Sequence, residues 1–187
     1  MAARIGVVVG NPSPNSRTRQ VAEDLAARIA DLIGAEVDET IELAEVATEI
    51  FEWKSDRLDR LNDRLATADF AVIATPTYKA SYTGLLKAFL DRYDSNGLHG
   101  LTAVPVFTIG SPAHTVAVEM TLRPLLVELG ASVPTKGLAF PTAKFDDRAE
   151  ILDEWIETQG AYLTRARWVR NCSGFTRYRR RVKIVRL

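Results

Sequence analysis

The sequence has few of the residues that build disulfides or metal centres, and it has no long apolar run. Cys172 is the only cysteine, so an internal disulfide is excluded, and no cluster of cysteine and histidine suggests zinc. No apolar run approaches the roughly 18 residues that cross a bilayer, and residues 1–9 lack the apolar core of a secretory signal peptide. These absences predict a cytoplasmic protein that binds no metal and has no membrane partner.

Two common nucleotide-binding signatures are also missing. Gly10 ends an apolar run, but it has no partner glycines at the positions of the dinucleotide motif G-x-G-x-x-G. The residues after it lack the Lys-Ser or Lys-Thr pair of a P-loop. A nucleotide site in this chain must therefore be built in another way.

Composition and charge indicate one soluble domain with a basic tail. The chain has 187 residues, of which 47% are hydrophobic and 26% charged, as in an ordinary globular domain. Nine of the 24 basic residues follow Glu157, the last acidic residue, so residues 1–157 carry a net charge of about −9. We expect a domain over residues 1–168 and a tail, 169–187, that is disordered or loosely docked. The tail could contact nucleic acid or anionic lipid, but neither is the preferred interpretation.

Short apolar runs alternate with segments of helical spacing. This order favours an α/β doubly wound sheet of about five parallel strands, in the order 2-1-3-4-5, with helices on both faces. Pro124 is expected to bend the helix over residues 116–129. The expected strands are residues 4–9, 35–41, 70–74, 103–109 and 131–140, and the other helices are 16–34, 56–68, one beginning at 81–84, and 151–168.

Three loops follow the first, third and fourth strands, whose ends lie side by side in such a sheet. The first loop (10–16) precedes a helix, where free backbone N–H groups and the helix dipole favour a phosphate. The second loop (76–81) contains Tyr78, which can lie against a flat ring. The third loop (110–115) begins at Gly110, whose backbone can approach a ligand closely. His114 is interpreted as a partly buried polar or helix-start residue, with a catalytic base as the alternative. A ligand with a phosphate at one end and a planar ring at the other, such as FMN, fits this layout.

Three segments resemble the NAD(P)H-dependent FMN reductase family. GNPSPNSRTRQVAEDLA is similar to its phosphate-loop signature, and ATPTYKASYTGLLKAFLD is similar to its P-x-Y-x-x-x-x-x-G-x-L-K-x-x-x-D segment. TIGSPAHTVAVEMTLRPLL resembles the third loop and following helix of the flavin reductases that serve two-component alkanesulfonate and methanesulfonate monooxygenases. The similarity covers about Ile5 to Phe140. It implies a flavodoxin-like fold and a homodimer or homotetramer.

The resemblance assigns roles residue by residue. Ser16 and Thr18 match phosphate-loop hydroxyls, and Gly110 and Ser111 match the loop on the far side of the flavin ring. Asn11 stands where Ser is usual, and Ser13 stands where Arg is common, so Arg17 would have to supply the phosphate charge. Met120 stands where some sulfonate-system members carry an aromatic residue associated with a distorted turn. The complete set of candidate cofactor-binding residues is Asn11, Ser13, Ser16, Arg17, Thr18, Pro76, Thr77, Tyr78, Lys79, Ala80, Ser81, Gly110, Ser111 and His114.

The function implied is an NAD(P)H:FMN oxidoreductase that uses FMN with NADPH or NADH and supplies reduced flavin to a partner flavin-dependent monooxygenase. Hydride transfer belongs to the cofactors, so no acid–base residue is assigned. Two alternatives stay open: a reductase that keeps its flavin and reduces quinones or azo compounds, and a non-catalytic flavodoxin-type electron carrier.

Overall fold

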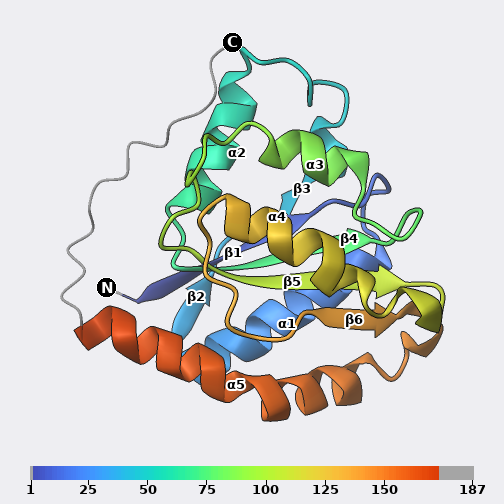
Figure 1. The fold of residues 1–187 in the computed structure, drawn as a ribbon, viewed down its shortest axis with the longest axis vertical. Coiled ribbons are helices and arrows are strands. Elements are labelled where there is room, and N and C mark those ends of the chain that lie inside the picture. The colour runs from blue at the N-terminus through green and yellow to red at the C-terminus, as the bar shows by residue number, and fades with distance from the viewer. Residues whose placement is uncertain (1, 173–187) are drawn as a thin grey trace.

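A parallel sheet forms the central layer of the computed structural model, which describes residues 2–172 (Figure 1). Within these residues the sheet has six strands in the order β2-β1-β4-β5-β6, and β3 also pairs with β1. This confirms the predicted order and the parallel pairing, with one strand more than expected. The strands are β1 (Ala3–Val9), β2 (Ala35–Val37), β3 (Ile41–Glu42), β4 (Phe70–Pro76), β5 (Thr102–Ile109) and β6 (Leu138–Pro141).

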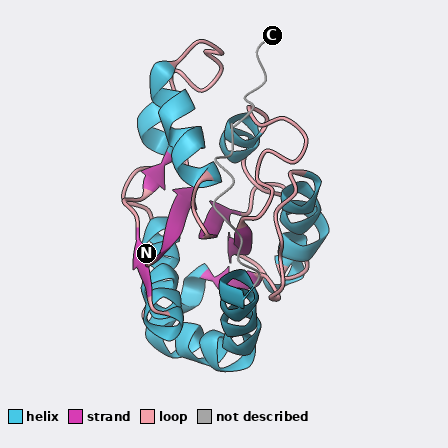
Figure 2. Cartoon of the chain, turned by 90° about the vertical axis from the view of Figure 1, so that its left-hand side faces the viewer, coloured by secondary structure: helices cyan, strands magenta, loops and turns pink. Residues whose placement is uncertain are grey.

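Helices cover both faces of the sheet, as Figure 2 shows from the side. Helices α1 (Arg17–Ile33) and α5 (Arg148–Cys172) pack on one face, where Leu25, Phe70 and Leu152 belong to one buried cluster. Helices α2 (Asp56–Ala66), α3 (Gly84–Leu90) and α4 (Arg123–Glu128) cover the other, around Leu58, Phe89 and other apolar side chains. Because both faces are covered, the central strands are almost continuously apolar rather than alternating.

The segment 35–41, expected to be one strand, forms two short strands. Ile5 pairs with Val37, whereas Val8 pairs with Ile41, so the second segment holds one residue more than β1 between these pairs. The carboxylate of Asp38 accepts hydrogen bonds at 3.0 and 2.6 Å from the guanidinium of Arg4. The extra residue separates β2 from β3, and this side-chain pair attaches Asp38 to β1 at the break.

The predicted helix 116–129 begins with a π-helical turn, η3 (Val118–Leu122), and continues as α4. Pro124 therefore lies in the first turn of α4, directly after the π turn, at a position where proline is tolerated. The π turn surrounds Met120, whose side chain is 72% exposed. A distorted turn is thus present although the residue at this position is not aromatic.

Arg123 and Glu119 anchor this turn to the segment before β6. Arg123 forms an ion pair with Glu119 and donates hydrogen bonds to the carbonyls of Val133 and Thr135 at 2.7 and 2.5 Å. Glu119 Oε1 also accepts the backbone N–H of Gly137 at 2.6 Å. These bonds hold residues 133–137 outside the ladder, so the last strand is shorter than the expected 131–140 and begins at Leu138.

Replacing Glu119 with glutamine is expected to make the free energy of unfolding depend less on pH in the acid range. The hydrogen bonds from Arg123, with the N–H of Gly137, lower the pKa of Glu119 below its ordinary value of 4.5. The stability that its charge provides is therefore present above pH 4.5 and is lost as pH falls through the lowered pKa. Because the pair is partly exposed, we expect Glu119→Gln to be about 1 kcal/mol less stable at pH 7, with a smaller difference below pH 4. Urea unfolding across this range measures it, and an unchanged gap at low pH would contradict the assignment.

The closing helix, α5, runs from Arg148 to Cys172 and is therefore longer at both ends than the predicted 151–168. Near its end Arg170 pairs with Asp69 and donates to the carbonyl of Gly100, two residues that precede β4 and β5. Residues 173–187 of the predicted tail lie outside the described part of the chain. Within the described part, no helix is long and apolar enough to cross a membrane, and no group of three or more His, Cys, Asp or Glu side chains could hold a metal ion.

Candidate functional site

The three loops expected to form one site leave the same edge of the sheet. β1, β4 and β5 are neighbours in the sheet and parallel, so their carboxyl ends lie together. The N–H of Gly10 donates to the carbonyl of Ala74 at 2.7 Å, and the N–H of Thr77 donates to that of Thr108 at 2.9 Å. These bonds join the starts of the first two loops to the adjacent strands. The chain thus brings the three loops side by side.

The first loop ends in a capped helix. Ser16 is the N-cap of α1, and its hydroxyl accepts the N–H of Arg19 at 3.2 Å. In the loop, Asn11 Oδ1 accepts the N–H of Ser13 at 2.9 Å. The first N–H groups of any helix have no acceptor within the helix, so the start of α1 offers donors to an anion. Arg17, the first residue of α1, is exposed and donates to the carbonyl of Thr142 at 3.3 Å, just beyond β6.

Thr18 and Asn11 hydrogen-bond within the protein. Thr18 is 2% exposed, and its hydroxyl lies 2.7 Å from that of Thr108 in β5. The side-chain amide of Asn11 donates to Thr18 Oγ1 at 3.1 Å. The hydroxyl of Thr83, the N-cap of α3, donates to the carbonyl of Gly10 at 2.6 Å. Both ends of the first loop are therefore fixed to the sheet and to α3.

The second loop ends in a tight turn. Tyr78 and Ser81 exchange two backbone hydrogen bonds of 2.9 and 3.1 Å, with Lys79 and Ala80 between them at φ angles of +52° and +62°. Tyr78 is 51% exposed, so its ring is free to contact a ligand. The hydroxyl of Thr77 is buried and has no hydrogen-bond partner among the described residues. A donor and acceptor is therefore available beside the tyrosine.

Replacing Ala80 with glycine is expected to stabilise the protein. An L-residue in the left-handed region is strained by about 1–2 kcal/mol, and glycine removes this strain while making the unfolded chain more flexible. The net gain should be about 0.5–1 kcal/mol, or about 1–4 °C in Tm. Thermal unfolding measures it, with Ala88→Gly in α3 as a control of opposite sign. A lower Tm for Ala80→Gly would show that this turn is not strained.

The third loop is open at its first residue. A Cβ added at Gly110 would meet no other atom within 4 Å, so the space beside it is free. Ser111 caps the short helix η2 (Pro112–His114), and its hydroxyl accepts the N–H of Ala113 at 3.3 Å. His114 is the last residue of η2, is partly exposed, and donates its backbone N–H to the carbonyl of Ser111 at 3.0 Å. Its partial burial agrees with the interpretation of His114 as a partly buried polar residue, whereas its position at the end of η2 is not that of a helix-start group.

Glu42 was not among the residues expected to support the site. It is 5% exposed at the end of β3 and accepts the N–H of Asn15 at 2.8 Å and a guanidinium N–H of Arg19 at 2.6 Å. Asn15 has a φ of +52°, a conformation that this bond helps to hold. Arg19 also bonds Glu23, and the hydrogen bonds to Glu23 and Glu42 raise its pKa. No local pattern in the sequence marks Glu42, because its partners lie 23 and 27 residues earlier.

The residues at this edge fit FMN. The start of α1 and the guanidinium of Arg17 suit a phosphate, the Tyr78 ring and the open space at Gly110 suit a flat ring, and the unpaired Thr77 hydroxyl suits its polar edge. Apart from His114, the three loops contain no histidine, carboxylate or cysteine. The residue types that are present suit the binding and orientation of a redox cofactor.

Comparisons with known proteins agree with this geometry. Residues 3–144 match the family described as NADPH-dependent FMN reductase. The chain is 35% identical to an FMN reductase (NADPH) of Escherichia coli (strain K12), in an alignment covering 54% of this chain and half of that relative. A solved structure of an NADH:FMN oxidoreductase (EMOB) in its apo form aligns with a TM-score of 0.76 and 31% identity over 89% of each chain. A flavodoxin from Streptococcus pneumoniae TIGR4 aligns with a TM-score of 0.55 and 20% identity, over 83% of this chain and 99% of the flavodoxin, which confirms the flavodoxin-like fold. The chain therefore belongs to the NADPH-dependent FMN reductase family.

Proposed function

We propose that this protein is an NAD(P)H-dependent FMN reductase. The observation that carries the proposal is the convergence of three loops at one sheet edge, with a capped helix start, an exposed tyrosine and an open glycine. Bound FMN would supply the hydride acceptor, and NADPH or NADH would supply the hydride. The protein would hold the two rings in register, because orientation of the reactants supplies much of the rate in such reactions.

Each loop has its own task in this proposal. The N–H groups at the start of α1, Ser16 and Arg17 would hold the phosphate of FMN. Tyr78, with the backbone of residues 76–81, would position the flavin ring, and Thr77 would donate to or accept from its polar edge. Gly110 and Ser111 would border the other side, and Arg17 would supply the charge that Ser13 does not.

Steady-state assays of the purified protein test the proposal directly. FMN-dependent oxidation of NADPH or NADH is the expected result, measured with FMN and FAD in separate series to establish flavin preference. No oxidation of either nicotinamide would overturn it. A yellow protein that turns over quinones faster than free FMN would favour the flavin-retaining reductase, and a yellow protein inert toward NAD(P)H would favour the electron carrier.

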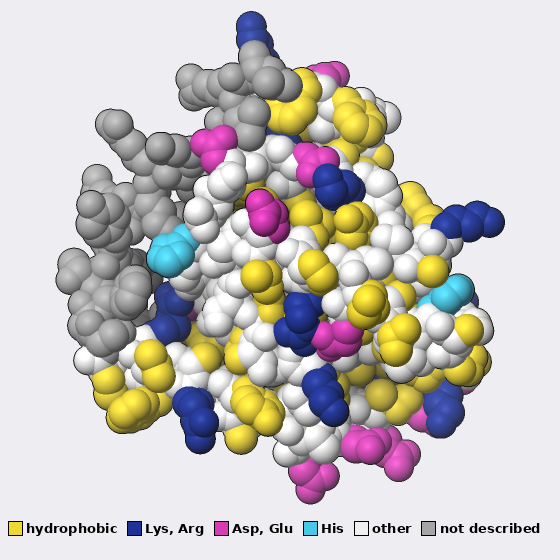
Figure 3. Space-filling model, viewed as in Figure 1, with side chains coloured by type: hydrophobic (Ala, Val, Ile, Leu, Met, Phe, Trp, Pro, Cys, Tyr) yellow, Lys and Arg dark blue, Asp and Glu magenta, His cyan; other side chains and the backbone are white. Residues whose placement is uncertain are grey.

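We also propose that the protein is a homo-oligomer in the cytoplasm and passes reduced FMN to a flavin-dependent monooxygenase. The apolar side chains exposed just before the π turn, in it and along α4, visible among the yellow atoms of Figure 3, support self-association. They are Val116, Met120 and Val127, which are 64%, 72% and 54% exposed. Light scattering should give a dimer or tetramer, and Met120→Glu should weaken it.

A further inference from the structure

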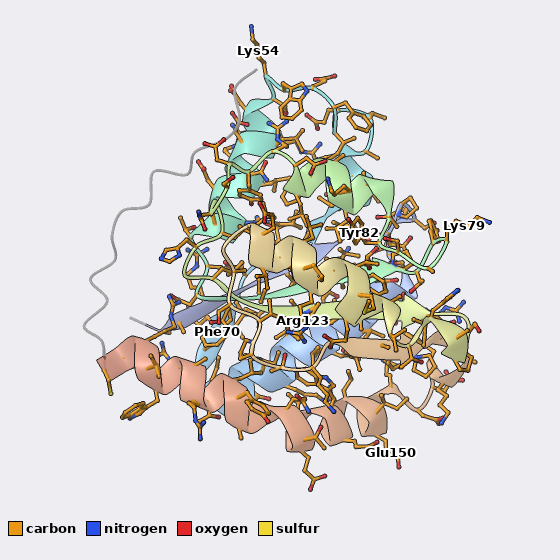
Figure 4. The ribbon with its side chains drawn as sticks, in the orientation of Figure 1. Lys54, Phe70, Lys79, Tyr82, Arg123 and Glu150 are labelled. Atoms are coloured by element: carbon orange, nitrogen blue, oxygen red, sulfur yellow. The ribbon has the colours of Figure 1, made fainter. Side chains whose placement is uncertain are left out.

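The turn at the end of the second loop presents a lysine without a counter-ion. No hydrogen bond or ion pair joins Lys79 to any described residue, and residues 70–90 contain no Asp or Glu. The other lysine of this stretch, Lys87, is paired with Asp91. In Figure 4 the labelled Lys79 side chain extends away from the ribbon beyond the end of β4. Its positive charge is therefore available to a ligand at the site edge.

The backbone that carries Lys79 is strained. Two-residue turns with positive φ at both positions favour Asn-Gly, because other residues crowd their own backbone in this conformation. Here Lys-Ala occupies both positions. Strained backbone of this kind is found preferentially at ligand sites. The turn directs Lys79 outward, and the cross-strand bonds between Tyr78 and Ser81 hold it there.

Lys79 lies in the second loop, whereas Arg17 is the first residue of α1. Arg17 lies at the start of α1 and bonds Thr142 after β6, where the proposed function places the phosphate of FMN. Lys79 instead follows Tyr78, next to the proposed ring position. A second molecule that stacks on the flavin ring would bring its own phosphates past this loop.

We propose that Lys79 is a specificity-determining residue that binds a phosphate of the nicotinamide dinucleotide, an inference that rests on the proposed function. A lysine ammonium binds phosphate as a point charge and needs no bidentate geometry, which suits an exposed side chain on a turn. The phosphate is either the 2′-phosphate found only in NADPH or the pyrophosphate shared by NADPH and NADH. In both cases Lys79 acts on dinucleotide binding and leaves the hydride step unchanged.

The test compares Lys79→Met with Lys79→Arg and with Lys54→Met. Lys54 is an exposed lysine with no hydrogen bond or ion pair to any described residue, and it lies far from this edge in Figure 4. Its variant makes the same change in net charge. We expect Lys79→Met to raise the KM for NADPH about tenfold, with kcat within about twofold. Fluorescence titration with FMN measures any separate effect of the variant on flavin binding. Lys79→Arg should keep most of the binding, and Lys54→Met should match the wild type. The KM of the wild type should rise more steeply with salt than that of Lys79→Met.

The NADH series separates the two phosphates. An increase in KM for NADPH alone identifies the 2′-phosphate, and an equal increase for NADH identifies the pyrophosphate. Equal KM values for Lys79→Met and Lys54→Met with both nicotinamides would overturn the inference while leaving the proposed function intact. A wild-type protein that binds FMN by fluorescence titration but oxidises neither nicotinamide would overturn the proposed function itself.

Discussion

Arg92→Ala is expected to lower the free energy of unfolding by about 2–4 kcal/mol, the largest effect of any single substitution considered. Arg92 follows α3 and is 1% exposed. Its guanidinium donates to Asp59 at 2.6 Å, and to Asn62 and the carbonyl of Glu52 at 3.0 Å. The alanine variant leaves the Asp59 carboxylate without its counter-ion and the Asn62 amide without its donor. Both α2 and the segment before it therefore lose the hydrogen bonds and the ion pair that Arg92 makes to them.

Arg60→Ala provides the matched control, because Arg60 lies on α2 and is exposed. Its effect should stay within about 0.5 kcal/mol. Urea unfolding at neutral pH measures both variants, with the slope of each transition checked against the wild type. An Arg92→Ala loss below about 1 kcal/mol would show that the buried guanidinium adds little to the fold.

Gly10→Ala is expected to damage both the fold and flavin binding. A Cβ at this position would lie 2.6 Å from Cβ of Leu86 and 3.3 Å from the hydroxyl of Thr83. Because Cβ of Leu86 is fixed to the backbone of α3, either the helix or the first loop must move. Overpacking of this kind lowers the free energy of unfolding by about 1–3 kcal/mol. The same shift separates the first loop from the start of α3, so FMN affinity should fall at least tenfold.

Gly110→Ala separates these two effects. Its added Cβ meets no protein atom within 4 Å, so the free energy of unfolding should change by less than about 0.5 kcal/mol. If the flavin ring lies against the third loop, FMN affinity should still fall. Fluorescence titration with FMN, paired with urea unfolding of each variant, gives both quantities. Unchanged FMN affinity in Gly110→Ala would place the ring away from this loop.

The sequence predicted the features that depend on local pattern. Apolar runs identified β1, β4 and β5, and the Ser16 cap and Gly34 set both ends of α1. From the strand order, the three loops were expected at one edge, and the structure confirms it. The match to the family likewise confirms the resemblance stated from the three motifs.

Features that depend on distant partners were not predicted. At the break between β2 and β3, Asp38 bonds Arg4, which lies 34 residues earlier. The hydroxyl of Thr18 contacts that of Thr108, which lies 90 residues later. The π turn has the apolar spacing of an ordinary helix, so periodicity alone does not reveal it. Sequence patterns report periodicity, whereas these features arise from side chains that meet only in the folded chain.

The bonds that join Thr18 to Thr108 and Thr83 to Gly10 have a thermodynamic consequence for the ligand. They order the first loop during folding. The loop therefore loses little further conformational entropy when FMN binds. Affinity for FMN should therefore depend strongly on variants that loosen these anchors, even where they touch no ligand atom. By mass action, saturating FMN should in turn raise the melting temperature, and anchor variants should show a smaller rise.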